Sequence, residues 1–299
     1  MTLERIGFIG LGDIGAPMAM RIADAGYAMH VYNRTAAKTA PLVQRGAVAV
    51  NSPADVARET DIIFLCVTDD AAIEQVVFGK DGVAEAGRPG QLVVDLSTIH
   101  PVATRNMAKR LHEQCSIAWV DAPVSGGSAG ARAGTLAVMA GGEAGDVDRA
   151  RPVIMSFAGH LTHMGPTGCG MATKACNQMI NCGTAAVVAE ALNLAHRFGI
   201  DAAKLPDALA GGIADSYVLK TYGPRMVAQT FSGNTNVTMK DINIVVDLGQ
   251  ITGSAIPITG LVSSFYRMLI ARGFSADGFS GVMRMYAEGP LEARKGQDA

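Results

Sequence analysis

The chain has 299 residues, 49% of them hydrophobic and 17% charged, with a formal net charge of −2 at pH 7. That length allows two domains with large cores, and the balanced charge argues against a nucleic-acid-binding surface. The sequence has no apolar run long enough for a membrane span, no secretory signal pattern at MTLERIGFIG and no CxxC pair among its five cysteines, so we expect a cytoplasmic protein with reduced thiols and no membrane partner.

The first half of the chain alternates short β-rich apolar runs with alanine-rich, helix-prone segments. Near-continuous apolar strands separated by helices indicate a parallel sheet covered by helices on both faces. The predicted strands are RIGFIG (5–10), AMHVYN (28–33), DIIFLCVT (61–68), QLVVDLS (91–97), IAWVDAPV (117–124), TLAVMAGG (135–142) and GHLTHMG (159–165).

The pattern changes after GPTGCG. One long helix is predicted from about residue 169 to residue 198, with Gly199 as its stop. The later segments also predict helices, and none is a clear strand. We therefore expect an α/β domain over residues 1–164 and an all-helical domain over residues 165–299.

A glycine-rich loop, GLGDIG, follows the first predicted strand and opens a helix. In a dinucleotide fold the first glycine makes the tight turn, the second lets the backbone approach the pyrophosphate, and the third lets helix and strand pack closely. The helix N-terminus supplies N–H groups and partial positive charge for the phosphates. The context favours a cofactor site over an ordinary tight turn, and its residues are Gly10, Leu11, Gly12, Asp13, Ile14 and Gly15.

The end of the second strand indicates which dinucleotide is bound. An NAD site usually has Asp or Glu there, whereas this chain has Asn33, Arg34 and Thr35. The planar guanidinium of Arg34 suits a 2′-phosphate, and Asn33 and Thr35 can add neutral hydrogen bonds. The alternative is a solvated surface arginine. We therefore favour NADP, with NAD as the second possibility.

A polar stripe lies on the long predicted helix. Its side chains, Lys174, Asn177, Gln178 and Asn181, share one face at spacings i, i+3, i+4 and i+7. The rest of the helix is mostly small and apolar, so it is expected to be buried, and a buried lysine is costly away from polar surroundings. Two interpretations stay open at this point: a functional stripe, or the wet face of an amphipathic helix.

Two further loops contain groups that could contribute to a binding site. In DAPVSGG, Ser125, Gly126 and Gly127 offer a hydroxyl and close backbone N–H groups, which can hold a carboxylate; the alternative is an ordinary turn. In DLST, Ser97 and Thr98 follow a strand and are expected at its carboxyl end, unless they cap the helix that begins near STIHP.

These segments together resemble the β-hydroxyacid dehydrogenase family, which includes the 3-hydroxyisobutyrate dehydrogenases and tartronate semialdehyde reductases. The matching segments follow the family's order and approximate spacing over nearly the whole chain: GFIGLGDIGAPMA, DLSTIHP, DAPVSGGSAGARAGTLAVMAGG, GCGMATKACNQ and MKDI. The resemblance implies a doubly wound Rossmann domain followed by a helical domain, an NAD(P) cofactor, a small β-hydroxyacid or semialdehyde substrate, and a homodimer or homotetramer.

The resemblance also implies roles for individual residues. Lys174 matches the family's catalytic lysine, a general acid and base. The substrate contacts that it implies are Ser125, Gly126, Gly127, Asn177 and Asp241. The cofactor contacts that it adds to the glycine loop and the second strand are Val67, Thr68, Thr98 and Lys240. Three positions depart from the family pattern. Asp13 stands where an uncharged residue is common, and Gln178 stands where a second Asn is common. Arg34 separates this chain from members with an acidic residue after the second strand.

Three alternatives are weighed against this function. A non-catalytic NADP-sensing protein is disfavoured by the presence of both Lys174 and Ser125. An imine reductase on the same scaffold is disfavoured because such enzymes tend to lack a lysine at the catalytic position. A zinc site at His160 and His163 is disfavoured because spacing i, i+3 on a strand points the two rings to opposite faces, so we predict no metal. We expect Ser216 and Tyr217 near the distal end of a substrate pocket.

Overall fold

The computed structural model describes residues 4–287 and 289–291. The chain divides into two compact units, Met1–Lys174 and Ala175–Ala299. The expected fold class is confirmed, because the first unit contains a Rossmann-like sheet and helices fill the second. The functional boundary that the sequence predicts between residues 164 and 165 stays a prediction.

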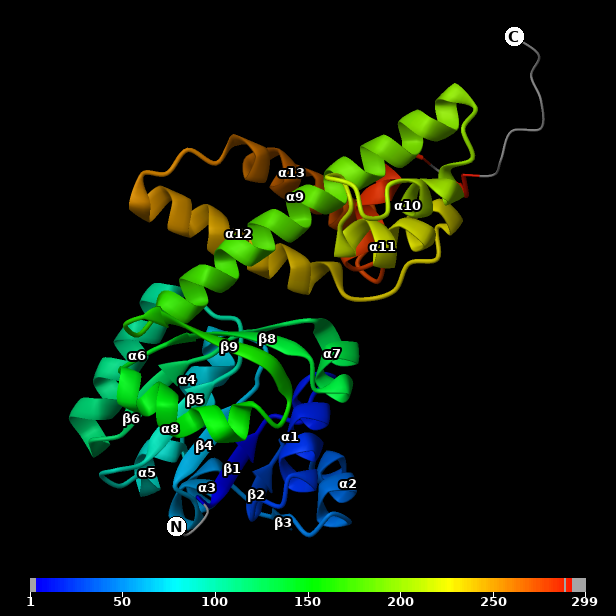
Figure 1. The fold of residues 1–299 in the computed structure, drawn as a ribbon. Helices are drawn as coiled ribbons and strands as arrows, with labels where there is room; N and C mark the ends of the chain where they lie inside the picture. The colour runs from blue at the N-terminus through cyan, green and yellow to red at the C-terminus, as the bar shows by residue number, and fades with distance from the viewer. Residues whose placement is uncertain (1–3, 288, 292–299) are drawn as a thin grey trace. The chain divides into compact units, whose positions relative to one another are not determined.

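A nine-stranded sheet forms the centre of the first unit within the described residues (Figure 1). Its strands coincide with the predicted apolar runs, with two short additions, β3 and β7. The strands are β1 (Ile6–Ile9), β2 (Met29–Tyr32), β3 (Val48–Ala49), β4 (Ile62–Leu65), β5 (Leu92–Asp95), β6 (Ala118–Asp121), β7 (Val124–Ser125), β8 (Leu136–Gly141) and β9 (Ala158–Gly165).

The strand order is β3-β2-β1-β4-β5-β6-β8-β7, with β9 beside β8. From β3 to β6 all neighbouring pairs are parallel, and the order reverses direction between β1 and β4. In such sheets, ligands bind at the carboxyl ends of the strands near this reversal. The carboxyl ends of β1, β2, β4, β5 and β6 therefore form the edge on which the cofactor residues were expected.

The parallel arrangement predicted from the first apolar runs does not extend to β7 and β8. Both β6 and β7 pair with β8 in the antiparallel sense. The connection from β6 to β8 contains only β7 and the seven-residue helix α7 (Gly127–Ala133). A parallel crossover would have to bring the chain back to the opposite edge of the sheet, whereas here β7 pairs directly with β8 as an antiparallel partner.

Helices cover both faces of the sheet because its strands are apolar on both sides. Along β4, Ile62 and Phe64 belong to one core, and Ile63 and Leu65 belong to the other. The first core includes residues of α1 (Gly15–Asp24), α2 (Ala40–Val43), which follows the short 3-10 helix η1 (Ala36–Thr39), α7 and α8 (Ala144–Ile154). The second core includes residues of α3 (Pro53–Glu59), α4 (Asp70–Phe78), α5 (Val83–Ala86) and α6 (Pro101–Cys115).

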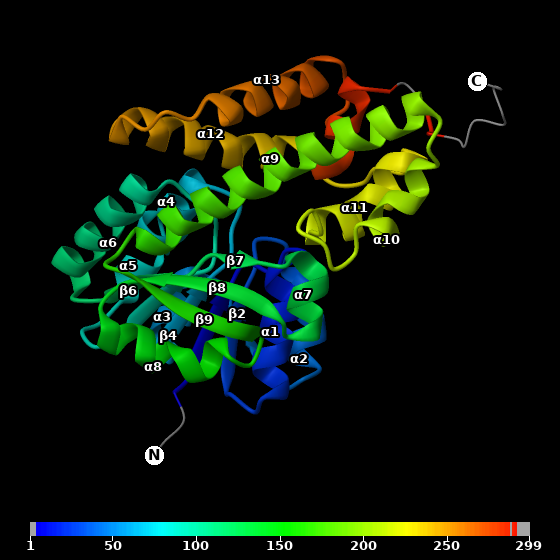
Figure 2. The same cartoon turned by 45° about the horizontal axis from the view of Figure 1, so that its top comes forward.

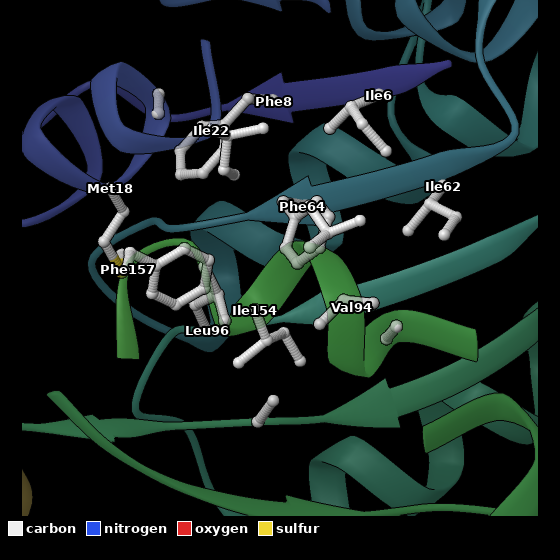
Figure 3. Packing of buried hydrophobic residues seen from close by; sticks show 14 of the residues in the cluster. Ile6, Phe8, Met18, Ile22, Ile62, Phe64, Val94, Leu96, Ile154 and Phe157 are labelled. Atoms are coloured by element: carbon white, nitrogen blue, oxygen red, sulfur yellow. The ribbon is translucent and has the colours of Figure 1, made fainter. Parts of the chain in front are cut away.

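Aromatic rings fix the first core (Figure 3). Phe8 of β1 stacks on Phe64 of β4 with 6.2 Å between ring centroids, and Phe157 meets Phe64 edge-on at 6.3 Å. Large buried rings in these geometries stabilise a sheet beyond their area alone. Phe157 follows α8, so this contact also holds that helix against the strands.

The second unit is helical, and no strand occurs among its described residues. Helix α9 (Cys169–Phe198) begins in the first unit and coincides with the predicted helix over 169–198. The other elements are η2 (Ala202–Lys204), α10 (Leu205–Ala208), α11 (Tyr217–Ala228), α12 (Thr235–Thr252), α13 (Pro257–Ala271) and η3 (Phe279–Met285).

Helices α12 and α13 lie side by side (Figure 2). Their shared core includes Tyr266, which is fully buried and donates its hydroxyl hydrogen bond to the carbonyl oxygen of Phe279 at 2.7 Å. The bond satisfies the polar end of an otherwise apolar side chain, as burial requires. None of the helices described here is both long and apolar enough to cross a bilayer.

Candidate active site

The glycine loop joins β1 to α1, and two of its glycines are required by the fold itself. Gly10 has a φ of +101°, and an added Cβ there would lie 2.1 Å from the carbonyl oxygen of Cys66. An added Cβ at Gly15 would lie 2.1 Å from the carbonyl oxygen of Gly10. These positions let α1 approach the turn closely, as the dinucleotide-binding pattern requires.

Gly12 differs from both neighbours because the protein itself does not require a glycine there. It is exposed, and an added Cβ would meet nothing within 4 Å. This open space lies on the approach to the N-terminus of α1, where helical N–H groups attract phosphate. The loop therefore fits a pyrophosphate that approaches the Gly12 backbone, whereas the exposed carboxylate of neighbouring Asp13 adds a negative charge nearby.

Asn33 ties the end of β2 to the glycine loop. Its Oδ1 accepts a hydrogen bond from the backbone N–H of Leu11 at 2.8 Å, and its Nδ2 donates to the carbonyl oxygen of Thr35 at 2.9 Å. Arg34 is exposed, and within the described residues its guanidinium has no hydrogen bond or ion pair. Asn33 thus holds the loop in place, while Arg34 and Thr35 lie exposed beside it.

The ends of β4 and β5 are joined through Ser97. The backbone N–H of Val67 donates to Ser97 Oγ at 2.9 Å, and the backbone N–H of Ser97 donates to Asp95 Oδ1 at 2.9 Å. The alternative role as a helix cap is not seen, because α6 is capped by His100, whose Nδ1 accepts from the N–H of Val102 at 3.2 Å. Ser97 therefore organises the segment that contains the predicted cofactor contacts Val67 and Thr68.

Asp95 is a site feature that sequence reasoning missed. Its side chain is fully buried, and its Oδ2 has no hydrogen-bond partner among the described residues. Burial raises the pKa of Asp95 to about 7, and the hydrogen bonds from Ser97 oppose that rise, while Asp121 and Asp70 add to it. The available signal was an acidic residue at the end of an otherwise apolar strand.

The DAPVSGG segment forms β7 and the start of α7. Gly126 precedes α7 with a φ of +129°, a region that residues with a Cβ rarely adopt. Gly127 is exposed, and an added Cβ would meet nothing within 4 Å. The loop thus leaves open backbone beside Ser125, which is the geometry that carboxylate binding by backbone N–H groups needs.

Lys174 is the last residue of the first unit and lies on the second turn of α9. It is only 7% exposed, which supports the functional interpretation of the stripe over the wet-face alternative. The start of α9 is held by Asp121, whose carboxylate accepts from the N–H groups of Gly168 at 2.7 Å and Met171 at 2.8 Å. Asp121 belongs to the DAPVSGG motif, but nothing in the sequence indicates this role.

In the second unit, a chain of polar side chains links α9 to α12. Asn177 Nδ2 donates to Gln178 Oε1 at 2.8 Å, and Gln178 Nε2 donates to Asp241 Oδ2 at 2.6 Å. Lys240 Nζ forms an ion pair with Asp241 Oδ1 at 3.3 Å. Because a carboxylate can only accept, Asp241 fixes the direction of both amides.

The histidines weighed as a zinc site lie on the predicted strand GHLTHMG. His163 Nε2 lies 2.8 Å from the carbonyl oxygen of Gly142, and no group of three metal-ligating side chains occurs in the described part of the chain.

Ser216 caps α11, because its Oγ accepts from the N–H of Leu219 at 3.0 Å, and its neighbour Tyr217 is exposed. The pocket role of Ser216 and Tyr217 stays a prediction.

Comparison with known proteins covers nearly the whole chain. Residues 5–165 match the family model for the NAD-binding domain of 6-phosphogluconate dehydrogenase. Residues 168–286 match the model for the NAD-binding domain of NADP-dependent 3-hydroxyisobutyrate dehydrogenase. The boundaries of the two matches follow the change from alternating strands and helices to helices alone.

Individual relatives are similar over nearly their whole length. The chain is 35% identical to 2-hydroxy-3-oxopropionate reductase of Escherichia coli over 91% of this chain and 93% of the relative. It is 31% identical to an NAD-dependent L-serine dehydrogenase of Pseudomonas aeruginosa over 95% and 98% of the two chains. The solved structure of Mycobacterium tuberculosis 3-hydroxyisobutyrate dehydrogenase with L-serine superposes with a TM-score of 0.85 at 28% identity, over 95% of this chain and 99% of that one.

Proposed function

The chain belongs to the 3-hydroxyisobutyrate dehydrogenase family of NAD(P)-dependent β-hydroxyacid dehydrogenases, and we propose that it interconverts a small β-hydroxyacid and its semialdehyde with NADP as the preferred cofactor. The observation that carries this proposal is the near-complete burial of Lys174 in the unit that also contains the glycine loop. An ammonium kept from bulk water beside a dinucleotide fold suits proton transfer to a reacting carbonyl.

NADPH, when bound, supplies the hydride. The chain's own residues would hold it in two places. The backbone around Gly12 and the N-terminus of α1 would take the pyrophosphate, and the exposed guanidinium of Arg34 would take the 2′-phosphate. The preference for NADP over NAD follows from Arg34, together with the lack of a carboxylate in the sequence NRT that follows β2.

Lys174 would donate or accept the proton of the reaction, depending on its direction. In the reducing direction its ammonium donates a hydrogen bond to the aldehyde oxygen and then the proton, as negative charge develops there. In the oxidising direction the neutral amine accepts the proton of the alcohol. The same side chain thus serves as general acid and general base in opposite directions.

The remaining contacts would orient the substrate. Ser125 and the N–H groups of Gly126 and Gly127 would bind its carboxylate. The substrate roles of Asn177 and Asp241 and the cofactor roles of Thr68, Thr98 and Lys240 rest on the family resemblance. The Asn177 amide is supported for such a role because Gln178 and Asp241 already fix its direction.

The similarity to a 2-hydroxy-3-oxopropionate reductase supports short substrates in which one carbon atom separates the carboxylate from the reacting carbon. We also propose that the protein forms a homodimer or homotetramer, as the family resemblance implies. We propose a reducing, cytoplasmic compartment as well, which is supported by the free thiols of Cys66, Cys115, Cys169 and Cys176.

A panel of short semialdehydes and β-hydroxyacids, assayed in parallel with NADPH and NADH, tests the proposal. The expected result is saturable oxidation of NADPH with at least one semialdehyde. Absence of turnover with every compound and both cofactors would overturn the function. A clear preference for NADH would leave the reaction standing and overturn the cofactor assignment.

A further inference from the structure

We propose that Asp121 is a positioning residue, which sets the first turn of α9 against the sheet and thereby places the Lys174 amine relative to the Ser125–Gly127 loop. This inference rests on the proposed function. Asp121 is the last residue of β6. Its effect on the reaction would be exerted through the backbone on both sides of it.

The first line of support is the pair of hydrogen bonds that Asp121 makes with the start of α9. Its Oδ1 accepts from the N–H of Gly168 at 2.7 Å, and its Oδ2 accepts from the N–H of Met171 at 2.8 Å. These N–H groups have no partner within the helix, and a carboxylate is the strongest acceptor for them. Because the two oxygens bind two different residues, they fix both the position of the helix along its axis and its rotation about that axis.

The second line of support is the close packing around this carboxylate. An added Cβ at Gly170 would lie 2.4 Å from the carbonyl oxygen of Asp121 and 2.5 Å from that of Met139. An added Cβ at Gly141 would lie 2.6 Å from the N atom of Gly170. The start of α9 therefore lies directly against β6 and β8, with no side chain between backbone and backbone.

The third line of support is the short separation along the chain between these contacts and the two segments proposed to act in the reaction. Lys174 follows Met171 by three residues and Gly170 by four, so it stands one helical turn beyond the bonds to Asp121. In the other direction, Ser125 follows Asp121 by four residues, with Pro123 between them. One side chain thus connects the segment proposed to hold the carboxylate with the helix proposed to carry the proton.

Charge is consistent with this role. Burial raises the pKa of Asp121 to about 6, and the backbone hydrogen bonds, led by those of Gly168 and Met171, oppose that rise. The carboxylate is therefore mostly ionised at neutral pH. A negative charge at the N-terminus of a 30-residue helix interacts favourably with the helix dipole.

The experiment compares Asp121→Asn with Gln91→Ala in the full-length protein. Asparagine keeps the shape of the side chain but replaces one acceptor with a donor, so one of the two bonds to α9 is lost. Gln91 is a matched control because it is also buried and also hydrogen-bonded to backbone, donating from Nε2 to the carbonyl oxygens of Ala57 and Thr60, but it precedes β5 at the opposite edge of the sheet. Thermal unfolding, NADPH affinity, kcat, KM and amide hydrogen exchange are measured for both.

We expect Asp121→Asn to lower kcat by about tenfold or more, since small misplacements of a reacting group are costly. Its NADPH affinity should stay at the wild-type value, and the amides of Gly168 and Met171 should exchange faster. Gln91→Ala should lower the unfolding temperature without changing kcat. Wild-type kcat in Asp121→Asn, or an equal loss of kcat in Gln91→Ala, would overturn the positioning role.

Hydrogen exchange in the wild-type protein keeps the inference testable if Asp121→Asn does not fold. The amides of Gly168 and Met171 should be strongly protected; exchange at the rate of an unstructured peptide would overturn the inference. This arm needs no substrate. Failure of the proposed function, seen as absence of turnover in the wild type, is therefore distinguishable from failure of this inference.

Discussion

Asp95 and Asp121 occupy paired positions on the neighbouring strands β5 and β6, and both side chains are fully buried. The two carboxyl groups differ in their partners. Asp121 accepts hydrogen bonds from the start of α9, whereas Asp95 Oδ2 has no partner among the described residues. Burial raises the pKa of Asp95 to about 7 and that of Asp121 to about 6, and the negative charge of Asp121 adds to the rise at Asp95.

The first prediction is that the free energy of unfolding falls as pH rises through the range set by this pair. The folded protein binds these protons more tightly than the unfolded chain, where an aspartate has a pKa near 3.8. The stabilisation is therefore fully present below pH 3.8 and is lost as pH rises through the folded values of about 6 and about 7. For Asp95 alone the shift corresponds to ~4 kcal/mol as an upper estimate.

Chemical denaturation across this pH range, with wild type and Asp95→Asn, checks the prediction. The variant cannot titrate at this position, so its stability should depend less on pH. Asp61 does not interfere, because the hydrogen bond from Arg5 lowers its pKa and moves its effect to more acidic pH. Parallel stability curves for the two proteins would contradict the assigned role of Asp95.

The second prediction separates the glycines of the cofactor loop. Gly15→Ala should destabilise the protein by about 1–3 kcal/mol, because its Cβ would lie 2.1 Å from the carbonyl oxygen of Gly10. Gly12→Ala should leave stability nearly unchanged, because its Cβ would meet nothing within 4 Å. It should nonetheless weaken dinucleotide binding strongly, since the methyl group occupies the approach to the pyrophosphate.

Thermal unfolding without nucleotide and titration with NADPH distinguish the two effects. If Gly12→Ala bound NADPH as tightly as wild type, the loop would not be the pyrophosphate site.

The third prediction concerns the two adjacent residues after β2. Arg34→Ala should weaken NADPH binding by about 10- to 100-fold, as expected for loss of a charged hydrogen bond, and should leave NADH binding unchanged. Asn33→Ala is the matched control. It removes the bond to the Leu11 N–H, so it should weaken both cofactors alike. Equal losses of NADPH and NADH in Arg34→Ala would contradict a contact with the 2′-phosphate.

The fourth prediction is that Lys174→Met lowers kcat by about 10²- to 10⁴-fold while the affinity for NADPH is retained. Methionine keeps an unbranched side chain of similar length without the proton. Lys109→Met serves as the control, because its side chain is 76% exposed and its ion pair with Glu113 lies on the surface of α6. Steady-state kinetics and nucleotide titration provide the measurement, and near-wild-type turnover in Lys174→Met would exclude the lysine as the acid and base.

Elements with a strong local pattern were predictable from the sequence. Helix α9 was predicted at its observed bounds, because its helical pattern is uninterrupted and Gly199 follows it directly. The early strands were equally clear, since their apolar runs end in turn residues. The antiparallel direction of β8 was not predictable, because direction depends on the path of the connection from β6 and not on the residues within the strand.

The candidate site was predictable only where a motif indicates it. The glycine loop and the DAPVSGG segment were visible as sequence, and the structure adds why individual positions in them are glycine. Asp95 and Asp121 were overlooked because burial of a strand-end carboxyl depends on helices that come from other parts of the chain. The bond from Leu11 to Asn33 joins residues 22 positions apart and has no local signature.

The two neighbouring side chains after β2 differ in their surroundings: Asn33 is bonded to the glycine loop, and Arg34, the proposed contact of the 2′-phosphate, is exposed. Asn33 accepts the hydrogen bond from the Leu11 N–H and so holds the glycine loop, and its exposed neighbour Arg34 has no part in that bond. Under the proposed assignment, the preference for NADP over NAD is therefore separable from the integrity of the glycine loop, and an exchange confined to position 34 is the first step to test for converting the protein to the unphosphorylated dinucleotide.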